Sequence, residues 1–227
     1  MKVVILAGGF GTRLSEYTKI IPKPMVKING KPIIHRIMDH YAKYGHKDFY
    51  IALGYKGKII RDYFKKKKIK SWNINLIETG LNTMTGGRLK TIGKLFNDKI
   101  FFVTYGDGLS NVNLRKLLKF HNKNNKLVTL TAVRPPARFG ALKIKHNLVS
   151  HFKEKSRTEE NWINGGFFVM NSKFLKYLKN KQTVLEKNPL EKIAKQKQLS
   201  AFKHKGFWQC MDTKKDRKIL QGILKKN

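Results

Sequence analysis

The sequence opens with a short apolar run that ends in a cluster of glycines, and this junction limits the fold more than any other feature. Residues 3–6 are four consecutive apolar side chains, typical of a strand buried on both faces of a parallel sheet. Gly8, Gly9 and Gly11 follow. A glycine-rich loop after the first strand of an α/β sheet lets the backbone approach a nucleotide phosphate. The junction therefore predicts an α/β protein with a nucleotide site near its N-terminus.

Strand-like and helix-like apolar patterns alternate over the first 133 residues. Strands are predicted at 48–53, 74–77, 100–104 and 127–133, and helices at 32–44, 59–64, 89–96 and 114–121. This alternation predicts a doubly wound, mostly parallel sheet with helices on both faces, as in Rossmann-like folds.

The pattern changes after Arg134. Strands are predicted at 142–144, 148–152 and 167–170, and short helices near 174–178, 190–195 and 215–224. We therefore predict one domain over residues 1–227, with a nucleotide-binding part at 1–133 and a smaller C-terminal part at 134–227.

Charge is the next unusual property. The chain has 49 lysines and arginines against 14 aspartates and glutamates, a net charge of +35. Such a balance is typical of nucleic-acid-binding proteins. Only nine of these residues are arginine, the better reader of phosphates and bases, and the lysines are spread over the whole chain. We therefore predict no nucleic-acid partner.

Targeting and redox features are few. No apolar run approaches the roughly 20 residues of a membrane span, and the N-terminal run is too short for a signal peptide. Cys210 is the single cysteine, so neither an intrachain disulfide nor a cysteine metal cage can form. We expect a cytoplasmic protein with no membrane partner.

Two basic side chains near the glycine loop are candidates for phosphate chemistry. Arg13 directly follows the loop and can fork onto phosphate oxygens. Lys23 lies between Pro22 and Pro24, which stiffen the segment and aim its ammonium group. The glycines alone would be only a turn, and their spacing matches neither a Walker loop nor a dinucleotide fingerprint.

The stretch as a whole resembles a family signature. Gly8-Gly9-Phe10-Gly11-Thr12-Arg13-Leu14, then Pro22-Lys23-Pro24-Met25 and the pair Lys31-Pro32, is similar to the signature of the sugar-1-phosphate nucleotidyltransferases, also called NDP-sugar pyrophosphorylases. Within that family the chain is most similar to the glucose-1-phosphate cytidylyltransferases. The similar blocks are residues 12–16, 54–57, 84–90, 104–108, 138–142, 163–168, 206–209 and 211–213.

The chain departs from the family pattern in three places. It has only six residues between Phe64 and Ser71, where the resembled proteins carry a longer segment. Ser156 and Cys210 stand where proline is usual. The missing segment bears on the oligomer and the nucleotide preference more than on the reaction.

The resemblance implies a role for each matched residue. Arg13 and Lys23 are the expected catalytic residues, with Lys23 stabilising charge at the reacting phosphorus. Asp107 and Asp212 are expected to hold Mg²⁺, a hard cation that takes carboxylate and phosphate oxygens. The expected nucleotide-binding residues are Leu6, Ala7, Gly8, Gly9, Gly11, Thr12, Arg13, Thr85, Gly86, Arg88 and Gly106. The sugar phosphate is expected at Gly140, Glu154, Lys155 and Asn164, in the part spanning 134–227.

The implied substrates are CTP and glucose-1-phosphate, the implied product CDP-glucose for lipopolysaccharide O-antigen sugars, and the implied assembly a homo-oligomer. A phosphate oxygen of the sugar phosphate attacks the α-phosphorus of CTP, and pyrophosphate leaves. That oxygen is anionic near neutral pH, so no general base is expected, and positioning and electrostatics supply the catalysis.

Several alternatives stay open from the sequence. Asp107 could be a turn aspartate, Asp212 a helix cap, and Gly86-Gly87 a tight turn into a helix instead of a backbone that contacts the base. Arg88 could stack on the base or pair with a phosphate. The same chemistry could use UTP, dTTP or GTP. From another class, the chain could be a basic nucleic-acid-binding protein or an inactive nucleotide-binding homologue.

Overall fold

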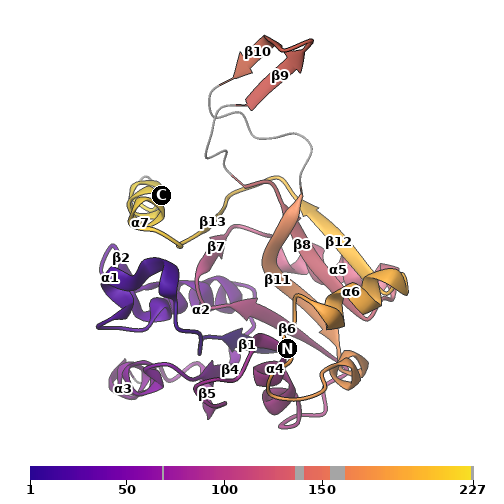
Figure 1. Cartoon of the computed structure of the whole chain (residues 1–227). Helices are drawn as coiled ribbons and strands as arrows, with labels where there is room; N and C mark the ends of the chain where they lie inside the picture. The colour runs from indigo at the N-terminus through magenta and orange to yellow at the C-terminus, as the bar shows by residue number, and fades with distance from the viewer. Residues whose placement is uncertain (68, 136–140, 154–161, 226–227) are drawn as a thin grey trace.

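A computed structural model describes residues 1–67, 69–135, 141–153 and 162–225 (Figure 1). Within these ranges, one seven-stranded sheet with the order β12-β8-β11-β6-β1-β4-β5 forms the centre of the molecule. Its strands are β1 (Lys2–Leu6), β4 (Asp48–Leu53), β5 (Asn73–Glu78), β6 (Ile100–Tyr105), β8 (Val128–Val133), β11 (Ile163–Asn171) and β12 (Leu199–His204).

The strand order contains one reversal beside β1. The chain runs from β1 outward through β4 and β5, and β6 then returns to the other side of β1, with all these pairings parallel. Ligands of α/β sheets bind where the strand order reverses, because the loops on either side diverge there. The reversal therefore places a ligand site at the carboxyl ends of β1 and β6, and the predicted doubly wound α/β fold is confirmed.

The later part of the chain completes the same sheet. β11 is antiparallel to both of its neighbours, β6 and β8, whereas β12 is parallel to β8. β11 also has a register shift between Asn164 and Phe168. The sequence pattern did not predict β12, an edge strand whose side chains are only half-buried or exposed.

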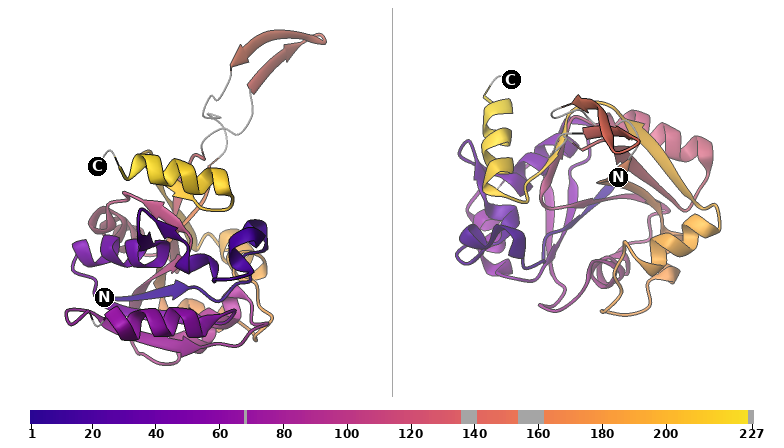
Figure 2. Two further views of the ribbon diagram at one scale, coloured as in Figure 1. Left: turned by 90° about the vertical axis from the view of Figure 1, so that its left-hand side faces the viewer. Right: turned by 45° about the horizontal axis from the view of Figure 1, so that its top comes forward.

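Helices cover both faces of the sheet (Figure 2). One face packs against α2 (Ile33–Lys43), α3 (Gly57–Lys67), α5 (Leu114–Asn124) and α7 (Lys214–Ile223). The other packs against α4 (Thr85–Gly93), α6 (Asn188–Lys195) and the 3₁₀ segment η3 (Ser172–Tyr177). β1 shows why its apolar run is unbroken: Val3 and Ile5 join the first core, while Val4 and Leu6 join the second.

Short elements surround the carboxyl edge of the sheet. They are η1 (Thr12–Leu14), α1 (Ser15–Thr18), η2 (Lys23–Met25), the pair β2 (Lys27–Ile28) and β3 (Lys31–Pro32), and the pair β7 (Gly108–Ser110) and β13 (Trp208–Cys210). α4 begins at Thr85, four residues before the predicted start, so the two glycines after Thr85 lie inside its first turn.

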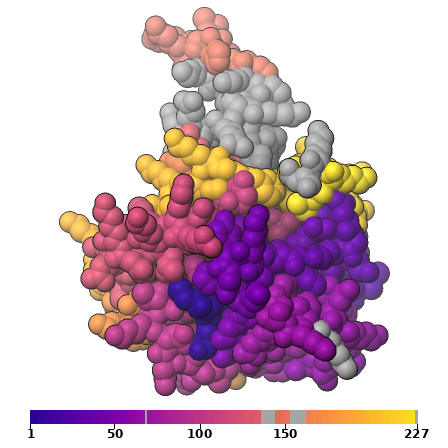
Figure 3. All heavy atoms as spheres, turned by 180° about the vertical axis from the view of Figure 1, so that it is seen from behind, coloured from indigo at the N-terminus to yellow at the C-terminus, as the bar shows by residue number. Residues whose placement is uncertain are grey.

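One hairpin stands away from the sheet. β9 (Ala141–Lys145) pairs antiparallel with β10 (Leu148–Lys153), and the pair projects beyond the body in ribbon and space-filling views (Figures 1 and 3). Its apolar side chains are largely exposed, Ile144 at 66% and Phe152 at 63%. No described helix is long and apolar enough to cross a membrane.

Two histidines are half-buried on the α2 side of the sheet. Nε2 of His40 donates to the carbonyl oxygen of Val112 at 3.0 Å, and the ring of His46 lies 4.8 Å from that of Phe102. Burial lowers the pKa of both His40 and His46 to about 4. The folded protein therefore favours the neutral form of each ring.

We predict that the free energy of unfolding falls as the pH is lowered from about 6.5 to about 4. Unfolded histidine has a pKa of about 6.5, so the unfolded chain binds more protons than the folded chain throughout this window. His40→Gln keeps an N–H donor for Val112 and removes the titrating ring, so it should weaken this pH dependence. Urea unfolding near the two ends of the window measures it. The matched control is His151→Gln on the exposed hairpin, and an unchanged pH dependence in His40→Gln would contradict the assignment.

Candidate active site

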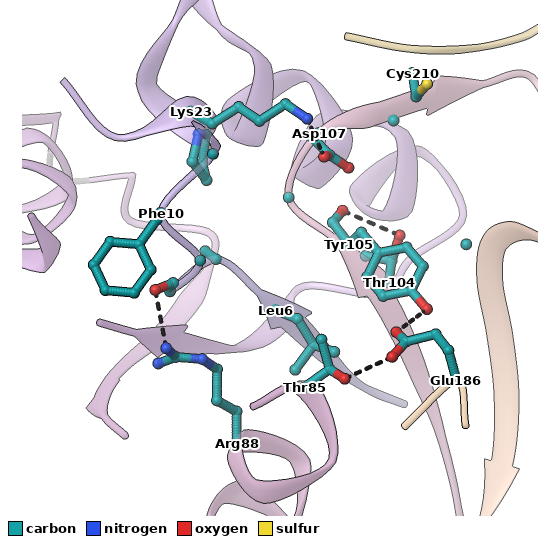
Figure 4. Close-up of a pocket in the computed structure, with 18 of the residues that line it drawn as sticks. Leu6, Phe10, Lys23, Thr85, Arg88, Thr104, Tyr105, Asp107, Glu186 and Cys210 are labelled. Atoms are coloured by element: carbon teal, nitrogen blue, oxygen red, sulfur yellow. Dashed lines mark hydrogen bonds and ion pairs between the residues drawn. The ribbon is translucent and has the colours of Figure 1, made fainter. Parts of the chain in front are cut away.

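A cleft of about 920 Å³ opens at the carboxyl edge of the sheet. It is lined by the loop after β1, the loop after β5, the turn between β6 and β7, the start of β11, and the segment around β13. The cleft thus lies at the reversal in strand order, where the fold predicts a ligand. Figure 4 shows side chains from these segments pointing into it.

The glycine loop turns sharply into η1. Gly11 has a left-handed backbone with φ of 66°, which favours glycine, and a Cβ there would lie 3.0 Å from Cβ of Lys23. The carbonyl of Gly11 accepts the N–H of Leu14 and closes the turn. This geometry brings Arg13 to the edge of the cleft, beside Lys23.

Lys23 is the centre of an ionic cluster. Its Nζ donates to Oδ2 of Asp107 at 2.7 Å and to Oδ1 of Asp212 at 2.6 Å. Nη1 of Arg13 donates to the other carboxylate oxygen of Asp212, also at 2.6 Å. The side chains of Lys23 and Asp212 are about one-tenth exposed, whereas that of Arg13 is 76% exposed. The cluster thus has a buried ammonium at its centre and a guanidinium group at its solvent edge.

The cluster favours the charged forms of Lys23 and Asp212. Burial lowers the pKa of the Lys23 ammonium, but the two carboxylates outweigh this effect and the net pKa is raised. Burial raises the pKa of Asp212, yet its bonds to Lys23 and its proximity to Arg13 bring the net pKa below the usual range. Burial, with Asp212 and Asp107 nearby, raises the pKa of the Cys210 thiol to about 12, so this thiol stays protonated near neutral pH.

Asp212 is aimed at Lys23 by the residues that follow it. α7 is capped by Thr213 and Asp216, whose side chains each accept the other's backbone N–H. Oδ2 of Asp216 also accepts the N–H of Asp212 at 3.0 Å. Thr213 and Asp216 therefore cap α7, and the alternative that Asp212 caps this helix is wrong.

A second polar group lies in the cleft beside α4. Glu186 accepts the hydroxyl of Tyr105 at 2.5 Å and the hydroxyl of Thr85 at 2.7 Å (Figure 4). Asn164 on β11 donates to the Tyr105 oxygen at 3.4 Å. No ion pair to Glu186 is found in the described part of the chain, unlike Asp107 and Asp212. Glu186 is thus a carboxylate that accepts from hydroxyl groups and makes no ion pair with Lys23 or Arg13.

The structure corrects the expectation for Gly86. Its N–H donates to the carbonyl oxygen of Thr183 at 2.9 Å, and a Cβ on it would lie 2.8 Å from the same oxygen. Gly86 does not line the cleft. Its small size lets the segment around Thr183 pack against α4, so its N–H is not free to contact a base.

Arg88 is among the residues that line the cleft, as predicted. Its guanidinium group donates to backbone carbonyls beneath the cleft, and the residue is 3% exposed. The other predicted residues in the described part of the chain do line the cleft, namely Leu6, Ala7, Gly8, Gly9, Gly11, Thr12, Arg13, Lys23, Thr85, Gly106, Asp107, Asn164 and Asp212. Gly140, Glu154 and Lys155 lie outside the described residues.

The sequence matches a known protein family over nearly its whole length. The family model described as "Nucleotidyl transferase" matches residues 2–216. The chain belongs to the nucleotidyl transferase family. A glucose-1-phosphate cytidylyltransferase from Salmonella typhimurium is 44% identical over an alignment that covers 100% of this chain and 96% of that protein. This alignment spans 248 positions, more than the 227 residues here, so the relative has insertions that this chain lacks.

More distant nucleotidyl transferases share the fold. A mannose-1-phosphate guanyltransferase from Yarrowia lipolytica is 31% identical, with coverage of 95% of this chain and 62% of that protein. The crystal structure of HddC from Yersinia pseudotuberculosis superposes with a TM-score of 0.79 at 27% identity, covering 98% of this chain and 99% of that one. HddC was also solved in complex with GMP-PN, and that structure superposes with a TM-score of 0.78.

Sequence reasoning missed several cleft residues of this nucleotidyl transferase, and Glu186 and Tyr105 form the polar group among them. Glu186 lies in a segment with no strong periodicity, and its contact with Thr85 joins residues 101 positions apart. Tyr105 lies in the matched block 104–108 and directly precedes Gly106 and Asp107, a position that places it at the cleft. Acidic residues are rare in this basic chain, 14 against 49 lysines and arginines, and that rarity was the signal that could have pointed to Glu186.

We predict that Lys23→Ala lowers turnover by roughly 10²–10³-fold, because one preorganised charge is lost. It should also lower the free energy of unfolding, by up to about 3–5 kcal/mol, since the buried Asp212 keeps only the solvent-edge Arg13 as a charged partner. Adding Asp212→Asn to Lys23→Ala should recover part of the stability and none of the turnover. Steady-state kinetics and urea unfolding measure the two effects. Lys19→Ala, at an exposed lysine, controls for the charge change, and near-parental turnover in Lys23→Ala would refute the catalytic role.

Proposed function

We propose that this chain is a glucose-1-phosphate cytidylyltransferase, which makes CDP-glucose and pyrophosphate from CTP and glucose-1-phosphate. The observation that carries the proposal is the buried ammonium of Lys23, held 2.7 and 2.6 Å from Asp107 and Asp212 at the edge of a nucleotide-sized cleft. The 44% identity to the Salmonella cytidylyltransferase over the whole chain supports the choice of substrates.

In the proposed reaction, an oxygen of the sugar phosphate forms a bond to the α-phosphorus of CTP. The bond from that phosphorus to the bridging oxygen breaks, and pyrophosphate leaves with the electron pair. An ammonium group has three N–H donors, and Asp107 and Asp212 occupy two of those on Lys23, so one is available for a phosphate oxygen. Arg13 uses one N–H on Asp212 and can direct the rest to the triphosphate.

The sugar is proposed to lie beside β11 and Glu186. A phosphate would be repelled by the Glu186 carboxylate, whereas the hydroxyl groups of glucose are neutral donors that suit it. Asn164, predicted to contact the sugar phosphate, lines the same side of the cleft and donates to Tyr105. The predicted contacts of Gly140, Glu154 and Lys155 with the sugar phosphate stay predictions.

Asp107 and Asp212 suit a divalent cation. Both carboxylates already contact one positive group, the Lys23 ammonium, so their oxygens converge on a single point. No group of three or more histidine, cysteine, aspartate or glutamate side chains that could hold a metal is found in the described ranges. Two carboxylates would leave the remaining positions of Mg²⁺ to water and phosphate oxygens, which is its usual preference. When bound there, Mg²⁺ would neutralise charge on the phosphates.

We predict that Asp107→Asn and Asp212→Asn each raise the Mg²⁺ concentration needed for half-maximal turnover and remove most of the activity. Each change replaces an anionic ligand by a neutral one. Turnover is measured against Mg²⁺ concentration, and Mn²⁺ binding is measured by calorimetry with and without CTP. Asp62→Asn, at a surface aspartate paired with Lys58, is the control. A parental Mg²⁺ curve in either variant would remove that aspartate from the metal site.

We predict that kcat/KM with glucose-1-phosphate is at least tenfold higher for CTP than for UTP, dTTP, GTP or ATP. One mismatched buried polar group costs about 1–3 kcal/mol, or roughly tenfold to a hundredfold in selectivity. Pyrophosphate release across the five nucleotides measures the preference, and mannose-1-phosphate serves as the alternative sugar. Equal use of UTP and CTP would remove cytidine from the proposal. A preference for GTP with mannose-1-phosphate would instead favour the activity named for the Yarrowia relative.

The assembly and the location stay predictions. We expect a homo-oligomer in the cytoplasm, with no nucleic-acid or membrane partner. The division into a nucleotide-binding part at 1–133 and a sugar-phosphate-binding part at 134–227 is likewise proposed. It agrees with a cleft that has the glycine loop on one side and Asn164 on the other.

A further inference from the structure

A bulge interrupts β11 where this strand passes the cleft. Between Asn164 and Phe168, β11 advances four residues while its partner β8 advances two. Gly166 lies in the bulge with a left-handed backbone, φ 77°, and a Cβ on it would lie 2.5 Å from the ring of Tyr105. Residues 163–167 all line the cleft. Because bulges beside active sites re-aim side chains, this one determines which groups of β11 face a ligand.

The bulge fixes how the side-chain amide of Asn164 is turned. Its Oδ1 accepts the backbone N–H of Gly166 at 2.9 Å, so the oxygen of the amide is directed at the strand itself. Its Nδ2 donates to the hydroxyl oxygen of Tyr105 at 3.4 Å and carries a second N–H. The Asn164 amide therefore presents N–H donors to the cleft, and such donors suit the oxygens of a phosphate.

The same bulge is fixed from β13 by the side chain of Trp208. Nε1 of the indole donates to the carbonyl oxygen of Gly165 at 2.7 Å. That carbonyl and the N–H of Gly166 belong to one planar peptide. Trp208 therefore binds one end of this peptide, and Oδ1 of Asn164 binds the other. The orientation of the Asn164 amide thus depends on a peptide plane that the indole fixes.

The backbone of Trp208 is constrained in turn by β7. Trp208 is paired with Ser110 in the sheet of β7 and β13. The carbonyl oxygen of Phe207, in the peptide that precedes Trp208, accepts the hydroxyl of Ser110 at 2.8 Å and the N–H of Asn111 at 3.1 Å. A side chain on so constrained a backbone can act as a rigid support for a neighbouring site.

We propose that Trp208 is a positioning residue for the sugar phosphate: its indole N–H fixes the peptide after Gly165, and this peptide turns the amide donors of Asn164 toward that substrate. The inference rests on the proposed function, in which Asn164 contacts the sugar phosphate. Trp208 lies four residues before Asp212. The same bond therefore links the segment of the proposed metal ligand to the sugar side of the cleft.

The first test removes the indole N–H and keeps an aromatic ring. Trp208→Phe should lower kcat/KM for glucose-1-phosphate by roughly 10–10²-fold, as expected when a binding group is misplaced by about 1 Å. The KM for CTP should stay close to that of the parent, because this bond does not fix the glycine loop. The matched control is Trp72→Phe, at an indole that packs on Phe49 in the core, and it should match the parent in both constants.

A double-mutant cycle tests whether Trp208 acts through Asn164. Asn164→Ala should itself lower kcat/KM for glucose-1-phosphate. Adding Trp208→Phe to Asn164→Ala should cause little further loss, because the effects of residues that act through one contact are not additive. Losses that multiply in the double variant would overturn the proposal, and so would a parental kcat/KM for glucose-1-phosphate in Trp208→Phe.

Amide hydrogen exchange tests the arrangement without any substrate. The N–H of Gly166 should exchange faster in Trp208→Phe, because its peptide is no longer fixed at the carbonyl end. The amides of residues 168–170, in the regular part of β11, should exchange as in the parent, which separates a local change from a loss of global stability. Parental exchange at Gly166 would overturn the proposal. If the parent does not turn over CTP with glucose-1-phosphate, the proposed function fails, while exchange at Gly166 still tests the role of Trp208.

Discussion

The candidate site depends on a buried ammonium group that two carboxylates hold at the edge of the cleft. Lys23 is 84 residues from Asp107 and 189 from Asp212, yet it contacts both. A charge this poorly hydrated is tolerated only when it is paired and hydrogen-bonded. The pairing therefore ties η2, the turn after β6 and the segment before α7 to one point. Those are the segments that would have to converge on a phosphate.

A second buried cation is balanced in another way. Arg88 has carbonyl and hydroxyl oxygens around it in place of carboxylates. Carbonyl dipoles leave the local charge positive, which suits a cleft that takes a triphosphate. Lys23 and Arg88 lie on opposite sides of the glycine loop, and Arg88 donates to its backbone at the carbonyl of Gly8 (Figure 4). The loop is thus constrained by charge from both sides, and its glycines allow both approaches.

The excess of basic residues is largely separate from this site. Lys65, Lys66 and Lys67 are exposed in the last turn of α3, where cations interact favourably with the carbonyl end of a helix. The few acids are informative by contrast. Asp107 and Asp212 pair with Lys23, Asp216 fixes the segment that carries Asp212, and Glu186 accepts two hydroxyl groups in the cleft. Four of the 14 acidic residues thus serve one cleft.

The sequence by itself determined the fold class, because unbroken apolar strands such as residues 3–6 have only one stable environment, between two layers of helices. It also pointed to Arg13, Lys23, Asp107 and Asp212 through a resemblance that local motifs carry. The tertiary structure alone decided which groups meet. It showed that Gly86 donates to Thr183, that Arg88 contacts the ends of three strands, and that Glu186 lies against Thr85 and Tyr105. Edge strand β12 and the α7 cap at Thr213 and Asp216 were likewise found only there. Local patterns record which face of an element is buried, whereas these contacts depend on strand order and on loops that meet from distant parts of the chain, which no local period encodes.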